Sequence, residues 1–343
     1  MSLQRRSYRP TVSDQLEERL VMSQVTGHIA AAAVQVLPTV RNTPVPLGPF
    51  GTLGDSYTDE YRFYTPDRST ARNWVDILHT QRLVSFGPFS TISRGAPREQ
   101  GYAYNWAQSG ATSTDMINDQ LPGLTAQVAK GEIRYATMLI GGNDYLDVVE
   151  GAAAGLIPPQ NVGAVLTQTT TQAIQNVETA VGTLLAASPT VKLVMFTIDV
   201  TDLPISHLVA STPQGQQLIA ATGQAVDVFN AAIKQIAASQ PSRIALVDLQ
   251  GLVQQVGSSP TGTIDFGGTT IRLTTIGDDY HNFFLADGIH PGTVAQTIIA
   301  DTIVQTLDAK WNIGLFPVTE QEGIRYARAV YNQSLHHTAA TKG

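Results

Sequence analysis

Tyr-Ala-Thr-Met-Leu-Ile-Gly at residues 135–141 is a nearly continuous apolar run, and residues 191–199, which begin Val-Lys-Leu-Val-Met-Phe-Thr-Ile, repeat the pattern. Strands that are buried on both faces, as in a parallel sheet, have such runs. Shorter apolar runs lie near residues 49–54, 102–107 and 243–249. The sequence therefore predicts strands at these five places.

Helical patterns separate the predicted strands. Residues 73–84 carry apolar side chains at helical spacing, and residues 293–307 place Val and Ile on one stripe. Residues 161–187 and 214–239 are long and rich in Ala, Gln and Val. Alternating strands and helices predict a doubly wound α/β sandwich, in which sites form at the carboxyl ends of the strands.

Two segments look like additions to this core. Residues 258–284 contain two β-like runs around Gly267-Gly268, a pair that is typical of a tight hairpin. Near the C-terminus, Thr319 and Glu322 predict a capping box at the start of a packing helix. We expect a β-hairpin insertion at the first segment and a helical extension at the second.

Composition excludes several classes of function. The 343 residues have a net charge of −7, only 14% charged residues and no cysteine. Disulfides and Cys-ligated metals are therefore excluded, and nothing in the sequence calls for a cofactor. No apolar run is long enough to span a membrane, and the scattered basic residues argue against nucleic-acid binding. Oligomeric state cannot be derived from these features.

The N-terminus favours export. Three arginines within residues 5–9 are followed at residues 15–23 by Gln-Leu-Glu-Glu-Arg-Leu-Val-Met-Ser, which resembles the opening of many exported bacterial proteins. An amphipathic arm is the alternative. We expect residues 1–44 to form an N-terminal arm or export segment with a linker, residues 45–312 the α/β domain, and residues 313–343 the extension.

Two motifs follow the first two predicted strands. Leu53-Gly-Asp-Ser-Tyr57 places Ser56 on a tight turn after a strand, as nucleophilic serines of α/β enzymes are placed. Asn105-Trp-Ala-Gln-Ser-Gly-Ala-Thr112 brings in Gly110, whose backbone N–H could approach a reacting carbonyl oxygen. A helix N-cap and a turn glycine are the respective alternatives.

Two further motifs come later in the chain. Ile140-Gly-Gly-Asn-Asp144 can point the Asn143 amide into a site, although an Asx turn would use the same residues. Ala286-Asp-Gly-Ile-His-Pro-Gly292 places Asp287 three residues before His290, so that the carboxylate can orient the imidazole.

The sequence contains rival Asp-x-x-His pairs. Asp76 and His79 fall within a predicted amphipathic helix, where packing explains them. Asp278 and His281 lie in the predicted insertion, with no core helix after them. His290 precedes a core helix and is the preferred base, with His281 as the rival.

Taken in order, Gly-Asp-Ser, Ser-Gly, Gly-Gly-Asn-Asp and Asp-Gly-Ile-His-Pro resemble the four sequence blocks of the GDSL lipase/esterase family, also called SGNH hydrolases. The resemblance spans residues 53–292 and implies a three-layer α/β/α sandwich around a five-stranded parallel sheet. Tyr57 departs from the Leu that usually follows the serine.

The resemblance implies a serine ester hydrolase that needs no cofactor. Its catalytic residues would be Ser56, His290 and Asp287, and its oxyanion hole would be formed by Ser56, Gly110 and Asn143. An acyltransferase, or a non-catalytic binding protein on the same fold, is the alternative.

Substrate contacts are expected at Tyr57, Trp106 and Asp144, because aromatic rings beside acidic groups suit a sugar and its hydroxyls. For Trp106, packing in the core is the competing interpretation. We expect a small-molecule or carbohydrate ester with a short acyl chain. Asp59, Glu60 and Asp144 lack the spacing of a metal site, and none is expected.

Overall fold

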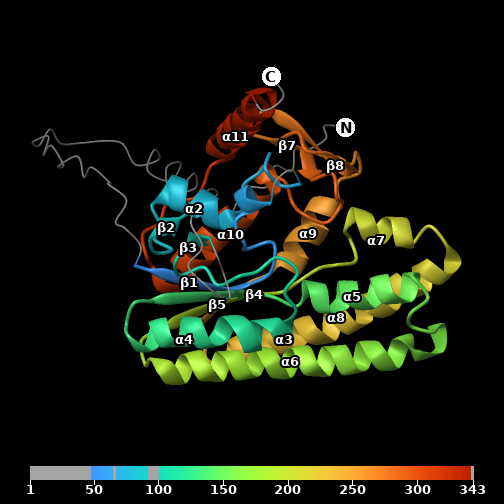
Figure 1. The fold of residues 1–343 in the computed structure, drawn as a ribbon, viewed down its shortest axis with the longest axis horizontal. Coiled ribbons are helices and arrows are strands. Elements are labelled where there is room, and N and C mark those ends of the chain that lie inside the picture. Colours follow the sequence, from blue (N-terminus) through green and yellow to red (C-terminus); the bar gives the residue numbers. More distant parts are fainter. Residues whose placement is uncertain (1–47, 65–66, 92–99, 341–343) are drawn as a thin grey trace, which may run out of the picture.

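The central sheet has four parallel strands in the order β1-β4-β5-β6 (Figure 1). The computed structural model describes residues 48–64, 67–91 and 100–340. The strands are β1 (Phe50–Gly54), β4 (Tyr135–Leu139), β5 (Lys192–Phe196) and β6 (Ile244–Val247). All residues of β1 and β4 are buried, as their apolar runs predict.

The prediction of a fifth strand at residues 102–107 is wrong. Only Gly101 and Tyr102 form a strand there, β3 (Gly101–Tyr102), which pairs antiparallel with β2 (Phe89–Ser90). The chain then runs beside β1 through a single parallel bridge between Thr52 and Asn105. The Asn105 side chain bonds the Thr58 carbonyl at 2.9 Å and the Thr52 hydroxyl, so a polar turn forms instead of a longer ladder.

Helices cover both faces of the sheet and make three layers, as predicted (Figure 1). The helices α5, α6 and α8 pack against one another on one face, and α4 packs against α6. On the other face α10 packs against α2, α11 and β6. The bounds are α2 (Trp74–Arg82), α4 (Leu121–Ala129), α5 (Gly142–Ala153), α6 (Val162–Ala187), α8 (Pro213–Ser239), α9 (Leu249–Gly257) and α10 (Thr293–Trp311).

Short helices connect these layers, and most of them lie near the carboxyl ends of strands. They are η1 (Tyr61–Phe63), α3 (Ser113–Asp115), the π-helix η2 (Met116–Gln120), η3 (Pro159–Asn161) and α7 (Pro204–Val209). The largest fully buried side chain is Trp74, which contacts Phe86 and Phe196 between α2 and the sheet.

A second sheet holds the predicted hairpin. Strands β7 (Thr263–Phe266) and β8 (Thr269–Ile276) pair antiparallel, and β9 (Asn282–Phe284) pairs parallel with β8. Gly267 and Gly268 have φ angles of 59° and 79°, which is the reason for glycine in this two-residue turn. The sheet ends just before the loop that carries His290.

The C-terminal helix α11 (Glu320–Ala340) packs on α10 and has the predicted capping box. Glu322 accepts a hydrogen bond from the backbone of Thr319 at 2.9 Å, and its own N–H donates to the Thr319 hydroxyl at 3.2 Å. Buried Arg82 reaches from α2 to the Phe316 carbonyl at 2.7 Å and to Glu322 at 2.7 Å. These bonds attach the extension to the core.

The predicted export segment lies within residues 1–47, outside the described residues. The division at residues 44 and 312 stays a prediction. Among the described residues, no helix is long and apolar enough to cross a membrane.

Candidate active site

The loop after β1 presents Ser56. A side chain at Gly54 would put its Cβ 2.7 Å from the Leu139 carbonyl, so only glycine lets β1 and β4 end this close together. The Asp55 carbonyl accepts the N–H of Thr58 and of Asp59, both at 3.0 Å, which closes a tight turn. Ser56 is 6% exposed, and its hydroxyl forms no hydrogen bond with any described residue.

Asp287 and His290 form a hydrogen-bonded pair before α10. The Asp287 Oδ2 to His290 Nδ1 distance is 2.5 Å, and Asp287 Oδ1 accepts the backbone N–H of His290 at 2.9 Å. Burial raises the pKa of Asp287, but the hydrogen bonds and charge of His290 outweigh it, so the pKa lies below its ordinary value. This geometry favours the tautomer that carries its proton on Nδ1.

Tyr57 connects the serine loop with the histidine loop. Its hydroxyl donates to the Ile289 carbonyl at 2.7 Å, and its ring centroid lies 6.1 Å from that of His290. Ser56 and Ile289 line the same cavity. No hydrogen bond joins Ser56 to His290, and His290 Nε2 instead lies 3.3 Å from Arg68 Nη1.

Unused N–H groups lie beside Ser56. The backbone N–H of Ser56 and that of Gly110 donate to no carbonyl in the described part of the chain. Gly110 has a φ of 82°, in the left-handed region, and is exposed. Asn143, in the first turn of α5, donates one amide hydrogen to the Ala111 carbonyl at 2.9 Å. The second and third motifs thus meet, and Gln108 of the second motif donates its N–H to the Gly54 carbonyl before Ser56 at 3.1 Å.

The other predicted substrate contacts have different surroundings. Tyr57 lines the cavity. The Trp106 indole N–H donates to Gln127 at 2.8 Å, and the ring covers Gly123 of α4, so it points away from the cavity. The Asp144 carboxylate accepts the backbone N–H and the hydroxyl of Ser113, at 2.8 and 2.6 Å, and burial raises its pKa.

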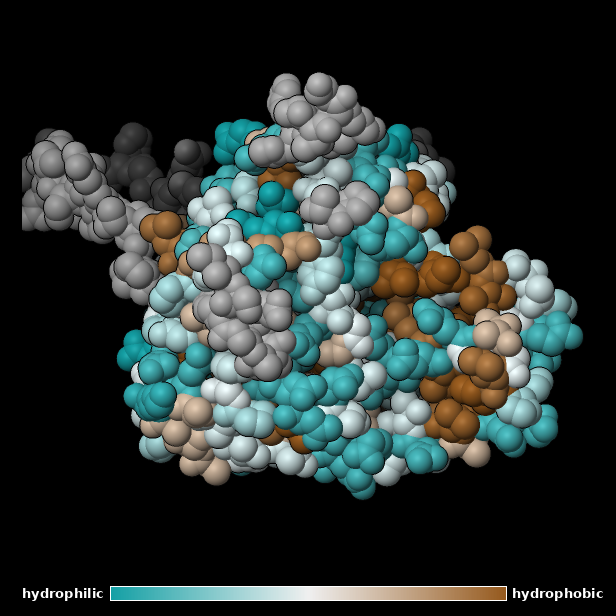
Figure 2. Space-filling view, in the orientation of Figure 1, coloured by the Kyte–Doolittle hydropathy of each residue, from teal (hydrophilic) through white to brown (hydrophobic). Residues whose placement is uncertain are grey.

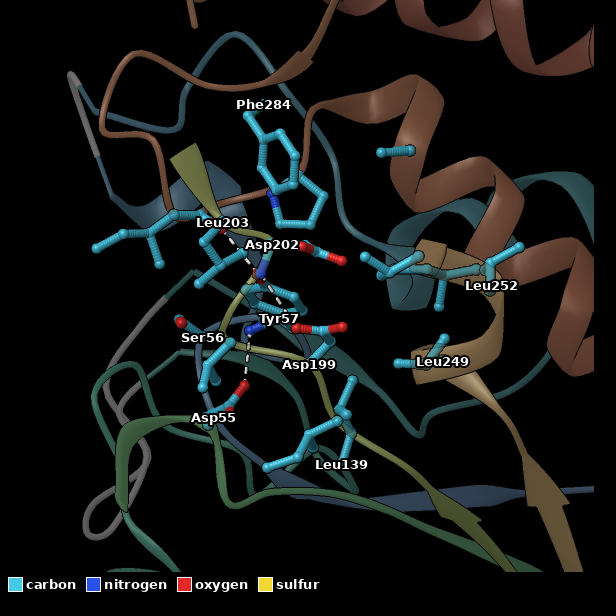
Figure 3. A pocket seen from close by; sticks show the side chains of 18 of the residues that line it. Asp55, Ser56, Tyr57, Leu139, Asp199, Asp202, Leu203, Leu249, Leu252 and Phe284 are labelled. Carbon is cyan, nitrogen blue, oxygen red and sulfur yellow. Dashed lines mark hydrogen bonds between the residues drawn. The ribbon is translucent and has the colours of Figure 1, made fainter. Parts of the chain in front are cut away.

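An apolar cavity opens beside Ser56 (Figure 3). Its volume is about 80 Å³, and its walls come from the ends of β4 and β5 together with α9, β9 and α10. The apolar side chains that line it include Leu139, Ile198, Leu203, Leu249, Leu252, Phe284 and Ile298. Of the predicted insertion, only β9 contributes to these walls.

Apolar surface continues from the cavity. Figure 2 shows brown side chains gathered over α5 and α7, where Leu208 is 66% exposed. Leu203 lines the cavity and directly precedes α7. The cavity therefore opens close to an apolar part of the surface.

Several ionisable residues at the site were not predicted from the sequence, among them Asp55, Asp199 and Arg68. Burial raises the pKa of Asp55 to about 7, and burial also raises the pKa of Asp199, which lines the same cavity (Figure 3). Asp55 is part of Gly-Asp-Ser, so its position directly before Ser56 could have indicated that it lies at the site. Arg68 belongs to no motif, and no signal in the sequence indicated it.

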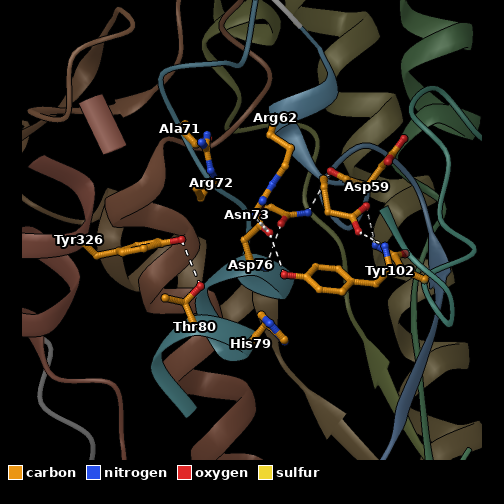
Figure 4. Close-up of polar contacts among 12 residues, drawn as sticks. Asp59, Arg62, Ala71, Arg72, Asn73, Asp76, His79, Thr80, Tyr102 and Tyr326 are labelled. Atoms are coloured by element: carbon orange, nitrogen blue, oxygen red, sulfur yellow. Dashed lines mark hydrogen bonds and ion pairs between the residues drawn. The ribbon is translucent and has the colours of Figure 1, made fainter. Parts of the chain in front are cut away.

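The rival histidines lie outside the cavity. His281 pairs with Asp279 at 2.8 Å rather than with Asp278, and His79 Nδ1 faces the Val84 carbonyl at 3.0 Å. Asp76 contacts Arg62 and the Tyr102 hydroxyl instead of His79 (Figure 4).

The carboxylates that were considered as possible metal ligands accept hydrogen bonds from other residues of the protein. Glu60 accepts the N–H of Tyr102 at 2.8 Å, and Asp59 accepts that of Ser109 at 2.9 Å. The described part of the chain contains no cluster of His, Cys, Asp or Glu that could hold a metal ion.

A parallel α/β sandwich with a serine, a histidine and a carboxylate at one edge of its sheet is an arrangement typical of hydrolytic α/β enzymes. The chain belongs to the GDSL-like Lipase/Acylhydrolase family, which matches residues 52–298. It is therefore a carboxylic ester hydrolase. No curated protein matches the sequence.

Solved structures of lipases and esterases are similar to this chain at low identity. The lipase Lip_vut3 from a goat rumen metagenome is 13% identical, with a TM-score of 0.47, over 76% of this chain and 97% of that one. The family 3 carbohydrate esterase of Clostridium thermocellum is 14% identical, with a TM-score of 0.40, over 76% and 95%. Phospholipase A1 from Streptomyces albidoflavus NA297 is 17% identical, with a TM-score of 0.40, over 77% and 99%.

Proposed function

We propose that the chain hydrolyses short-chain carboxylic esters through an acyl-enzyme on Ser56. The observation that carries the proposal is the hydrogen-bonded pair of Asp287 and His290, on a loop whose Ile289 carbonyl accepts the hydroxyl of Tyr57, the residue after Ser56. A histidine held by a carboxylate at Nδ1 can take the proton of a nucleophile at Nε2, which in His290 requires that the contact with Arg68 Nη1 be replaced.

In the first half of the reaction, Ser56 Oγ attacks the ester carbonyl while His290 Nε2 takes the hydroxyl proton. The tetrahedral intermediate collapses, the bond to the alcohol oxygen breaks, and His290 returns the proton to the leaving alcohol. Asp287 keeps the imidazole oriented and stabilises its charged form. Water then attacks the acyl-enzyme in the same manner and releases the acid.

The negative oxygen of the intermediate needs hydrogen-bond donors. The backbone N–H groups of Ser56 and Gly110 supply two, since neither donates to a described residue. Asn143 has a second amide hydrogen besides the one bound to Ala111. Together these groups form the proposed oxyanion hole.

The cavity supports a short acyl chain. Cavities of about 150 Å³ hold a benzene molecule, so 80 Å³ suits an acyl chain of only a few carbons. Its lining is apolar, which favours an alkyl chain over a sugar in this position. A carbohydrate, if it forms the alcohol half, would lie outside the cavity beside Tyr57.

Hydrolysis of p-nitrophenyl esters from acetate to palmitate tests the proposal, with wild type, Ser56→Ala and the control Ser85→Ala compared. We expect activity highest on short chains, lost in Ser56→Ala and kept in Ser85→Ala. A fluorophosphonate probe should label wild type but not Ser56→Ala. Persistent labelling of Ser56→Ala would refute the nucleophile, and activity that rises up to palmitate would refute the short acyl chain.

We also propose export, which rests on residues 15–23 and the arginines before them. Fractionation of the producing cells tests it, and a product that stays entirely in the cytosol would contradict it.

A further inference from the structure

A buried arginine contacts the nitrogen of His290 that is proposed to act as the base. Arg68 is 6% exposed, and its Nη1 is 3.3 Å from His290 Nε2. Its Nη2 donates to the Ser109 hydroxyl at 2.8 Å, directly before Gly110. The guanidinium lies 3.8 Å above the centroid of the Tyr64 ring and 5.5 Å from that of Tyr61.

No carboxylate of the described residues forms an ion pair with Arg68. Asp59 accepts the Ser109 N–H at 2.9 Å and the Tyr64 hydroxyl. Asp287 is turned toward His290. Buried guanidinium groups are normally paired with an anion, so this one has a positive charge to offer a ligand.

Arg68 lies outside the cavity proposed for the acyl chain. The acyl cavity is lined by Ser56 and Ile289 but not by Arg68 or His290. In ester cleavage His290 Nε2 must reach the leaving oxygen, since it donates the proton there. A group that contacts Nε2 from outside the acyl cavity therefore lies next to the alcohol half of the substrate.

We propose that Arg68 binds an oxyanion, a carboxylate or a phosphate, on the alcohol half of the ester, close to the scissile bond. This inference rests on the proposed function. A guanidinium can hold such groups through parallel hydrogen bonds. The anion would replace His290 Nε2 as the partner of Nη1, which leaves that nitrogen to accept the Ser56 proton. Arg68 thus selects anionic esters.

Matched butyrate esters test the proposal. The alcohols are glycolate, which is anionic, glycolamide, which is neutral, choline, which is cationic, and phosphoethylene glycol, which carries a phosphate. We expect kcat/KM of wild type to be about tenfold higher for the glycolate than for the glycolamide ester, and lowest for choline. The better of the two anionic esters identifies carboxylate or phosphate as the group bound.

Arg68→Gln should lower the ratio of glycolate to glycolamide by about tenfold. Arg134→Gln removes the same charge from the opposite end of β4 and should leave the ratio unchanged. Where Arg68→Gln fails to fold, Arg68→Lys keeps the charge without the planar fork, and the ratio should still fall.

An equal rate on neutral and anionic esters in wild type, or a ratio that Arg68 variants leave unchanged, would overturn the inference. Hydrolysis of the glycolamide ester would at the same time leave the proposed function standing. Failure to cleave any of the four esters would overturn the proposed function and this inference with it.

Discussion

The buried carboxyl of Asp55 makes the stability of the protein depend on pH. Burial is the largest effect on Asp55 and raises its pKa from 3.8 to about 7, while the hydrogen bond from the Tyr57 N–H opposes the shift. A carboxyl whose pKa is raised in the folded state does not lower the free energy of unfolding at pH values below its unfolded-state pKa. The loss in unfolding free energy grows as the pH rises from the unfolded pKa to the folded pKa, and it is constant above the folded pKa.

The perturbation is Asp55→Asn, which keeps the acceptor for Tyr57 and cannot ionise. A pKa of about 7 in place of 3.8 corresponds to a cost of about 4 kcal/mol at pH 8 and about 2 kcal/mol at pH 5. The free energy of unfolding of Asp55→Asn minus that of wild type should therefore increase by about 2 kcal/mol between pH 5 and pH 8.

Urea unfolding at both pH values, followed by tryptophan fluorescence, measures this difference. Asp119→Asn is the matched control, because Asp119 is exposed and the same charge is removed. Its difference from wild type should stay constant. If the Asp55→Asn difference is the same at pH 5 and pH 8, Asp55 is ionised in the folded protein and the reasoning fails.

Two further predictions concern the oxyanion hole and the C-terminal helix. Asn143→Ala should lower kcat by about 10²- to 10³-fold and change KM little, because its amide acts on the transition state. Steady-state kinetics on p-nitrophenyl butyrate measures both constants. An unchanged kcat would remove Asn143 from this role. Arg82→Met should lower the free energy of unfolding by about 3 kcal/mol in urea, since Glu322 and the Phe316 carbonyl lose their buried donor. An unchanged unfolding midpoint would show that the extension adds nothing to core stability.

Apolar runs predicted all four strands of the central sheet, together with a fifth that does not form. Residues 135–141, 191–199 and 243–249 are apolar because helices cover both faces of those strands. At 102–107 the same hydropathy does not produce a ladder, because the side chain of Asn105 bonds the turn after β1. Hydropathy reports burial, whereas the length of a strand depends on where each backbone group finds its partner.

Trp106 was expected at the substrate because it is close to Gly110 in the sequence. Its ring instead packs on α4, where Gly123 leaves room for it. A Cβ at Gly123 would lie 2.1 Å from the Trp106 ring. The direction of Trp106 depends on a glycine in another element, so no local pattern could predict it.

The order of the four motifs placed the candidate site because parallel strands deliver their carboxyl ends to one edge. The bond from Asn143 to Ala111 and the bond from Tyr57 to Ile289 join these motifs in space. The four motifs contain the groups that acyl transfer from any ester would need. The chemical roles of these groups stay predictions. In the proposed function, choice among esters depends on Arg68 and on cavity residues such as Leu252 and Phe284, which lie outside every motif. Proteins with this fold can therefore differ in substrate specificity while their motifs stay the same. Specificity has to be derived from the residues that surround Ser56 and His290 in three dimensions.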